Sequence, residues 1–520
     1  MSTLKINPHG GINRIFPQHR LVGKEVQKVQ ALENMLDLNG KTAIIGGAAR
    51  IAQTALPGDI KWAKRIYYKI GGDDKRDQFV LSAGKIYKLD ESTGTFNQSL
   101  ISNSADISLD SNFYPIDCSI KIAEQVSTFL VDGTYFYKFN GNQSGAWDRL
   151  PVKLDIDGNT IYPIFIIEYL DRLWCLVKGK NILLGSKNLN PESFDNATDS
   201  ILVELPSGNG GFPTGLVVIN GFLTVIHEDY YVPVTGSSPS TFGVRPGDVV
   251  YGYGSRAPRS ILNLKTEFAF LNSTDNEIYT SGGTLASTNR LPLSFDIALR
   301  NLIDPVKANL TVLHYDSNLR CIRVGYVLSG ESLLNAEEIY SLDEKKWCGQ
   351  TRNRNISCYC QWNGKNDDGR LLTGRSDTGL VMWNDANINF DGTAIHYKWV
   401  SASYMSGDET ADIEFERFYL DLKSLGNFNI QLSYYLDTRF TTVGTESVNM
   451  QGEIINLGLI EIGEQDIFLN PILPLIDKCR GRMIRFQIEG NQLNTKLEFY
   501  GLYADYNLQE SKTSKYIYGA

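Results

Sequence analysis

The stretch that decides the fold is "DRLWCLVKGKNILLGSKNLNPESFD", residues 171–195. An apolar run is followed by a glycine-containing turn, a second apolar run and a polar loop rich in Asn and Ser. Short apolar runs bounded by turn residues are typical of β-strands. We therefore interpret 171–195 as strand, tight turn, strand and loop, and we expect Trp174 and Leu183 to pack inside a sheet.

The same outline recurs in six further segments, at residues 78–96, 128–147, 215–236, 267–283, 319–347 and 369–385. The second apolar residues of the outer strands are Tyr87, Tyr137, Leu183, Tyr231, Tyr279, Tyr340 and Met382. They are 42 to 61 residues apart, a period typical of β-propeller blades with four short strands each. Because one blade alone leaves both faces and both edges open, the blades must stack radially. We predict about seven blades.

The domain organisation that follows is all-β. We expect an extended N-terminal arm over 1–45, a β-propeller over 46–395, a β-sandwich over 396–510 and a C-terminal tail over 511–520. The sandwich is predicted from the longer alternating strands after 396, as in "FERFYLDLKSLGNFNIQLSYYLD". We also expect "KTAIIGG" or "KRIYYKIG", both before residue 78, to pair with the last blade and close the ring.

The charge distribution indicates a partner surface near the N-terminus. The net charge is −9, yet residues 1–70 hold eleven Lys and Arg against four Asp and Glu. A basic segment on an acidic body indicates contact with an acidic partner or nucleic acid, and the alternative is a solvated strand face. The predicted partner-interface residues are Arg14, Arg20, Lys61, Lys64 and Arg65.

The cysteines and the apolar runs bear on where the protein is made. Seven cysteines, an odd number scattered among apolar neighbours, predict reduced thiols and synthesis in a cytoplasm. The opening "MSTLKINPHGG" lacks the apolar core of a signal peptide. No apolar run approaches the roughly 18 residues that cross a bilayer, so we expect no membrane span.

Two segments imitate nucleotide-binding motifs. "LNGKT" (38–42) resembles the end of a phosphate-binding loop, but Met35 stands where that loop needs glycine, so a hairpin turn is the better interpretation. "GYGSRA" (252–257) imitates the dinucleotide pattern, but Pro258 follows and no helix pattern succeeds it. We predict no cofactor, and no catalytic elbow or zinc-protease motif is present.

Other segments suggest metal or glycosidase chemistry and have simpler interpretations. "CYC" (358–360) places two thiols on one strand face without a second ligand pair, so structural cysteines are favoured. "LDIDGN" (154–159) and "NDDGR" (366–370) are interpreted as Asx-turn hairpins rather than calcium loops. "SDTGLVMW" (376–383) is similar to the Asp-box turn of sialidase propellers, which is itself structural. We predict no metal site and no enzyme.

Four elements carry a resemblance to a known family. They are the S-x-x-x-N-P-E-S-F loop (Ser186, Asn190 to Phe194), the G-x-L-x-V strand (Gly221, Leu223, Val225), the "GSSPSTF" turn (236–242) and the "DNEIY" strand end (275–279). Together they resemble the propeller-bearing nozzle or hub proteins of short-tailed phage tails, which include packaged-DNA stabilisation proteins. The resemblance is clear over about 170–300, and "PHGGINR" (8–14) fits an extended arm. The "SGESLLNAE" loop (329–337) departs from it.

The resemblance implies a homo-oligomeric ring, of six copies, below the portal and adaptor of the virion tail. Such a ring would retain the packaged genome and conduct double-stranded DNA during ejection, without sequence specificity. An acidic body is compatible with this role because Lys and Arg contacts to phosphate would grip the DNA. The alternatives are a propeller enzyme or lectin acting on bacterial surface glycans, with an axial pocket of paired carboxylates, and a monomeric peptide-docking hub.

Overall fold

The computed structural model describes residues 2–6 and 29–509, except residues 40, 53, 103–113, 123–124, 142–143, 208–210, 292–298, 365–366, 385–388, 406–411, 426–427, 437–443, 451–455, 458–459, 462–466, 470–471 and 482. Among the described residues strands predominate and the helices are short 3-10 turns, which confirms the all-β class. Within the described ranges, no helix has the length and apolar character needed to cross a membrane.

Six separate sheets form blades of a propeller-like arrangement. The first two are β6–β9 (Ile60–Ile70, Asp73–Ser82, Lys85–Asp90, Thr95–Gln98) and β11–β14 (Ile116–Ile122, Gln125–Val131, Phe136–Phe139, Trp147–Arg149), with β10 (Ile101–Ser102) parallel to β14. The next two are β15–β18 (Pro163–Tyr169, Arg172–Val177, Ile182–Gly185, Ile201–Glu204) and β19–β22 (Pro213–Ile219, Phe222–His227, Tyr230–Thr235, Gly243–Val244), with β23 (Val250–Tyr251) on β21. The last two are β24–β27 (Leu262–Asn263, Phe268–Leu271, Ile278–Ser281, Asn289–Arg290) and β32–β34 (Ile356–Gln361, Leu371–Arg375, Val381–Asn384) with β5 (Ala48–Arg50).

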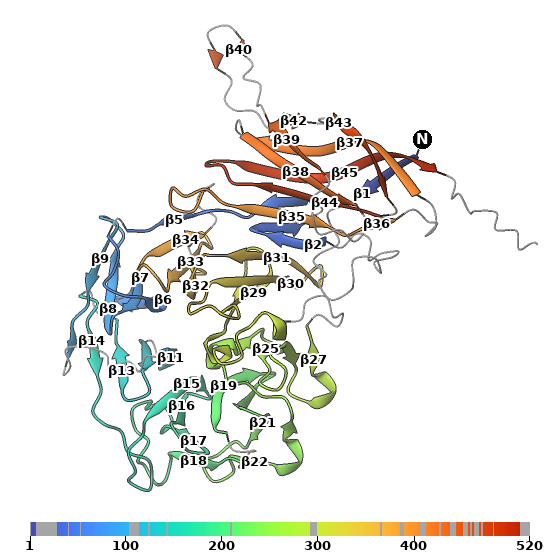
Figure 1. Cartoon of the computed structure of the whole chain (residues 1–520). Coiled ribbons are helices and arrows are strands. Elements are labelled where there is room, and N and C mark those ends of the chain that lie inside the picture. The colour runs from blue at the N-terminus through green and yellow to red at the C-terminus, as the bar shows by residue number, and fades with distance from the viewer. Residues whose placement is uncertain are drawn as a thin grey trace, which may run out of the picture.

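A four-stranded meander lies between the last two of these blades. It is formed by β28 (Val312–Asp316), β29 (Cys321–Tyr326), β30 (Ala336–Ser341) and β31 (Lys346–Arg352). Its first strand, β28, packs against both β24 and β32, and β32 in turn packs against β6. Contacts between first strands therefore run around a ring, as Figure 1 shows below the C-terminal strands.

The β28–β31 meander also belongs to a curled sheet that takes in both ends of the chain (Figure 1). Its N-terminal strands are β1 (Ser2–Ile6), β2 (Val29–Glu33), β3 (Met35–Leu38) and β4 (Lys41–Ile44). Its C-terminal strands are β35 (Tyr397–Ser401), β36 (Tyr404–Met405), β37 (Asp412–Leu425), β38 (Phe428–Leu436), β39 (Gly444–Met450), β42 (Ile467–Leu469), β43 (Ile472–Gly481), β44 (Met483–Gly490) and β45 (Lys496–Gln509). A small hairpin, β40 (Asn456–Leu457) and β41 (Ile460–Glu461), stands apart from it. Of the described strands of the predicted arm, β1, β2 and β4 pair with C-terminal strands, whereas β3 pairs with β4 and β31.

Burial explains why these segments are strands. The second strand of a blade is covered on both faces by neighbouring blades, so β16, RLWCLV, is buried at every position. In the curled sheet, β44 instead alternates buried and half-buried residues, as expected of a sheet with one covered face. Trp174 and Leu183 are fully buried in one cluster, which confirms their predicted packing role.

The seven residues that define the sequence repeat occupy equivalent places in their four-stranded units. Each of the seven residues that set the period lies in a third strand: Tyr87 in β8, Tyr137 in β13, Leu183 in β17, Tyr231 in β21, Tyr279 in β26, Tyr340 in β30 and Met382 in β34. Six of these strands belong to the separate blades, and β30 belongs to the curled sheet.

A strand from the N-terminal part completes the last blade. Met382 of β34 pairs with Arg50 of β5, and Asn384 pairs with Ala48. The closing strand is therefore neither of the two segments expected from the sequence. "KTAIIGG" supplies β4 of the curled sheet, and "KRIYYKIG" lies at the end of β6, the first strand of the first blade. Three residues of backbone pairing carry too little side-chain pattern to identify such a strand.

Candidate functional site

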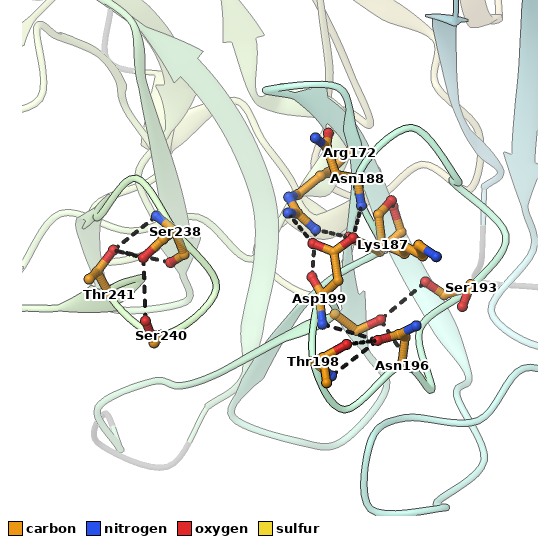
Figure 2. Close-up of polar contacts among 12 residues, drawn as sticks. Arg172, Lys187, Asn188, Ser193, Asn196, Thr198, Asp199, Ser238, Ser240 and Thr241 are labelled. Atoms are coloured by element: carbon orange, nitrogen blue, oxygen red, sulfur yellow. Dashed lines mark hydrogen bonds and ion pairs between the residues drawn. The ribbon is translucent and has the colours of Figure 1, made fainter.

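The loop of the "NPESF" motif joins β17 to β18 and is organised by one buried arginine. Arg172 donates hydrogen bonds to the carbonyl oxygens of Ser186 and Asp199, both at 2.6 Å. Its guanidinium also lies 2.7 Å from the Asp199 carboxylate, and this hydrogen bond lowers the pKa of Asp199. Figure 2 shows Arg172 pointing into the loop between its two ends. The loop is therefore a defined structure and not a slack connection.

Local hydrogen bonds shape the rest of this loop. The side-chain oxygen of Asn196 accepts bonds from Thr198, at 3.0 Å from the backbone and 2.7 Å from the hydroxyl (Figure 2). The backbone of Lys187 donates to the Ser193 carbonyl at 2.7 Å. Asn and Ser side chains favour turns because they replace backbone partners in this way. The polar side chains of the loop are thus explained by the hydrogen bonds that they form within it.

The "NPESF" part of the loop reaches the preceding blade. Phe194 is buried, and its ring stacks on Phe136 of β13 with the centroids 5.6 Å apart. Glu192 lies 2.6 Å from Lys138, also on β13, and 3.8 Å from Lys153. The motif residues therefore connect the β15–β18 blade to the β11–β14 blade.

The "GSSPSTF" turn repeats this arrangement one blade later. The hydroxyl of Thr241 accepts bonds from the backbone of Ser237 and Ser238, at 3.1 and 2.9 Å (Figure 2). Gly236 has φ +132°, and a Cβ there would lie 2.5 Å from the Phe242 Cα, so the turn requires glycine. Phe242 packs edge-on against Trp174 of the preceding blade, at 5.1 Å between centroids.

The "DNEIY" element is also structural. Asp275 accepts a hydrogen bond from the Tyr279 hydroxyl at 2.8 Å. The Glu277 side chain is buried, lies 3.0 Å from Arg290 and accepts the backbone N–H of Leu299 at 3.2 Å. Burial raises the pKa of Glu277 despite these partners. In the G-x-L-x-V strand, Leu223 and Val225 are fully buried.

The predicted partner-interface residues divide into two groups. Arg14 and Arg20 lie outside the described residues. Lys61, Lys64 and Arg65 lie on β6, the first strand of the first blade. All three have acidic partners within the chain: Lys61 lies 2.7 Å from Asp59, Lys64 lies 2.8 Å from Asp117, and Arg65 pairs with Glu91 and lies 3.6 Å from Asp367.

Their surroundings explain why these cations stand on a buried strand. Asp117 also accepts the indole N–H of Trp62 at 2.7 Å, and its charge raises the pKa of Lys64. The guanidinium of Arg65 lies 3.6 Å from the centre of the Trp362 ring. The positive charges of Lys61, Lys64 and Arg65 are thus paired with carboxylates of the same chain.

Tyr114 crosses the centre of the propeller. Its ring lies 4.5 Å from the Lys61 ammonium and 3.5 Å from the Arg259 guanidinium. Tyr114 precedes β11, whereas Arg259 belongs to the 3-10 turn η4 (Pro258–Ser260) of the β24–β27 blade. Two further blades separate them along the ring, so the contact spans the axis. Arg259 also donates to the carbonyls of Leu310, at 2.6 Å, and Ser357.

A buried charge network was not predicted from the sequence. Arg323, with no exposed side-chain surface, lies 2.9 Å from Asp316 and 3.4 Å from Glu337. Tyr359, on β32 of the next blade, donates to Glu337 at 2.7 Å. The only sequence signal was an arginine within the apolar run "LRCIRVGY". The network joins the β28–β31 meander to the last blade.

Two further motifs, "LNGKT" and "LDIDGN", fold as the turns that their sequences predict, whereas the first residue of "NDDGR" lies outside the described residues. "LNGKT" includes the β3–β4 hairpin turn, where Leu38 pairs with Lys41. In "LDIDGN", the carboxylate of Asp155 accepts the backbone N–H groups of Asp157 and Asn159, at 3.0 and 2.8 Å, which is an Asx turn. Burial raises the pKa of Cys360 to about 11, so this residue is a thiol at neutral pH. No cluster of three metal-ligating side chains occurs in the described part of the chain.

No family model matches the chain, and no curated protein is similar to it. The motif geometry is therefore the main structural basis for a functional argument.

Two cavities among the described residues are lined by charged side chains. One, of about 600 Å³, lies on the first blade and is lined by Asp77, Asp90, Lys75, Arg76 and Lys88, of which Lys88 lies 2.8 Å from Asp77. The other, of about 260 Å³, lies between the last blade and the curled sheet and is lined by Arg352 and Arg375. Arg352 lies 2.6 Å from Glu338 and Arg375 lies 2.7 Å from Asp377. Neither cavity includes Tyr114 or Arg259 of the propeller centre.

Proposed function

We propose that this protein is a structural subunit of the tail of a short-tailed bacteriophage. In this role it forms the nozzle or hub ring below the portal and adaptor, retains the packaged DNA and conducts it during ejection. It is made in the host cytoplasm and resides in the virion tail. The observation that carries the proposal is that the resemblance motifs form one structural unit, in which Phe194 and Phe242 each connect a blade to the preceding one.

The finer architecture belongs to the same proposal. We assign the β28–β31 meander as a seventh blade, because β28 packs between β24 and β32 as a first strand would. We assign the C-terminal strands as a sandwich-like domain. Its two layers would meet at the buried contact between Trp399 of β35 and Phe499 of β45, whose ring centroids are 4.9 Å apart.

Side chains at the centre of the propeller limit where DNA would pass. Tyr114 lies between Lys61 and Arg259 at the axis, and the adjacent Lys64 is paired with Asp117. A duplex therefore has no path through one propeller, and the conduit must lie between copies in a ring, which we propose has six. The acidic balance of the chain, −9 overall, favours weak contact with passing phosphates.

Of the five predicted interface residues, we retain only two in this proposal. Lys61, Lys64 and Arg65 have acidic partners within the subunit, which reduces the charge that they offer to another protein. We therefore propose Arg14 and Arg20 as the cations that contact neighbouring subunits of the tail.

Negative-stain microscopy and light scattering of the purified full chain test the proposed function. A closed ring of several copies with no glycan-hydrolysing activity is expected. A stable monomer that hydrolyses or binds bacterial surface glycans would contradict the proposal and support the alternative function. A stable monomer without that activity would contradict it as well and favour a peptide-docking protein.

A further inference from the structure

Four large apolar side chains are exposed on neighbouring turns of three consecutive blades. Leu170 is 51% exposed, Leu189 56%, Phe222 53% and Leu285 61%. We call these four residues the turn face. Leu170 lies between β15 and β16, Leu189 in the "NPESF" loop, Phe222 at the start of β20, and Leu285 after β26. Single exposed apolar residues are ordinary, but a group of them marks a binding surface when they are adjacent.

Hydrogen bonds and a close contact show that these turns are adjacent. The backbone of Leu189 donates to the carbonyl of Asp171, next to Leu170, at 3.0 Å. The hydroxyl of Tyr169 donates to the carbonyl of Gly221, next to Phe222, at 3.0 Å. A Cβ on Gly283, two residues before Leu285, would lie 3.1 Å from a side-chain carbon of Ile219. The turn face is therefore one continuous surface over the β15–β18, β19–β22 and β24–β27 blades.

The backbone at two of these positions is unfavourable for leucine. Leu170 has φ +52° and Leu189 has φ +55°, in the left-handed region that suits Gly, Asn and Asp. The equivalent hairpin turn of the next blade has Asn220 and Gly221, with φ +48° and +79°, which is the favoured pair for two positive φ angles. Leucine at position 170 thus adds strain and exposed apolar surface, and packing within the subunit explains neither. Strained, exposed positions of this kind point to a function.

Residues 7–28 of the chain have the composition that this surface requires. They hold Ile12, Ile15, Phe16, Leu21 and Val22, and four Lys or Arg against one Glu. Acidic Asp171, next to Leu170, and Asp195, in the same loop as Leu189, are exposed. Apolar and charged groups of the segment thus complement apolar and acidic groups of the surface.

The segment of the same copy has poor access to the turn face. It starts after Ile6 of β1 and ends before Val29 of β2, and both strands belong to the curled sheet. In Figure 1 the β15–β18 and β19–β22 blades, which carry Leu170, Leu189 and Phe222, lie at the opposite end of the molecule from β1 and β2. A chain anchored at both ends reaches outward by only about half its contour length. A neighbouring copy is the better source.

We propose that the turn face binds residues 7–28 of a second copy of this chain, with Phe16 or its apolar neighbours covering Leu170, Leu189 and Phe222. This inference rests on the proposed ring, and it names the contact that holds adjacent subunits together. Arg14 and Arg20 then face Asp171 and Asp195.

Photo-cross-linking of the full chain tests this contact. Phe16→p-benzoylphenylalanine is introduced, the assembled protein is irradiated, and covalent dimers at twice the 58.2 kDa chain mass are excised for peptide mapping. The expected result is cross-links from residue 16 to peptides that contain Leu170, Leu189 or Phe222. In a second step Leu189→Asp is expected to reduce the dimer yield about tenfold, which corresponds to about 1.4 kcal/mol. Val306→Asp, at an equally apolar position that is 86% exposed outside the turn face, should leave the yield unchanged.

The outcomes separate the docking surface from the ring. A ring whose cross-links map elsewhere, or whose yield falls equally with Val306→Asp, overturns the docking surface and leaves the proposed function standing. Absence of any ring, with no covalent dimer, overturns both.

Discussion

The rings of Phe194 and Phe136 stack 5.6 Å apart across the boundary between two blades. Phe194 lies within a polar loop, yet its ring is buried, and Arg172 hydrogen-bonds both ends of the loop. The same relationship recurs one blade later between Phe242 and Trp174. Aromatic residues of these loops therefore hold adjacent blades together, and their substitution should lower the free energy of unfolding.

Phe194→Ala is expected to lower the free energy of unfolding by about 3–5 kcal/mol, because it removes a buried aromatic ring and leaves a cavity between blades. Chemical denaturation followed by tryptophan fluorescence measures this change. Phe212→Ala serves as the matched control, since Phe212 is 43% exposed and should cost under about 1 kcal/mol. Equal changes in the free energy of unfolding for the two substitutions would contradict the role of Phe194 in holding two blades together.

Arg172→Met is expected to destabilise the protein by about 2–4 kcal/mol, since the charged hydrogen bonds to Ser186 and Asp199 are lost. The pKa of Asp199 should return upward towards the usual aspartate range, because the arginine is the main cause of its depression. NMR titration of the Asp199 carboxyl checks this shift. An unchanged titration in the variant would show that the arginine does not hold the loop.

Asp316→Ala is expected to cost about 3–5 kcal/mol, because it leaves the fully buried Arg323 with one acidic partner fewer. The double variant Asp316→Ala, Arg323→Met should regain part of this loss, since the buried arginine charge is removed and Glu337 keeps the hydrogen bonds from Tyr359 and Thr351. Equilibrium unfolding of the wild type, both single variants and the double variant provides the comparison. A double variant no more stable than Asp316→Ala would argue against a charge network.

The pH dependence of stability should report His314. Burial lowers the pKa of His314 to about 4, against its ordinary value of 6.5, near Asp316, Arg323 and Glu337. The unfolded chain then binds a proton more readily than the folded one, so stability falls as the pH drops from about 6.5 towards 4. His314→Gln should reduce this loss by about 1–3 kcal/mol. Unfolding curves at several pH values measure the difference, and parallel curves for variant and wild type would refute the assignment.

The blades can be predicted from local sequence patterns, whereas the pairing of strands distant in sequence cannot. The seven repeat residues, from Tyr87 to Met382, lie at one position of their meanders because each blade is a local hairpin series with its own turn residues. The pairing of β5 with β34 joins residues more than 300 positions apart through three backbone partners, which leaves no local pattern. The curled sheet is likewise built from both chain ends.

The candidate site shows the same division. The motif loops were identified from "NPESF" and "GSSPSTF", but their inter-blade role depends on Phe136 and Trp174, which lie in other blades. Charge alone predicts an interface at the basic residues near the N-terminus. Charge counting does not reveal that Lys64 faces Asp117 across a blade boundary.

The central claim is that this subunit assembles into a ring that conducts DNA between its copies. Light scattering coupled to size-exclusion chromatography of the full chain tests it most directly. We expect a single species of six times the 58.2 kDa chain mass, with a closed ring in micrographs of the same fraction. A species at the mass of one chain across the accessible concentration range would contradict it.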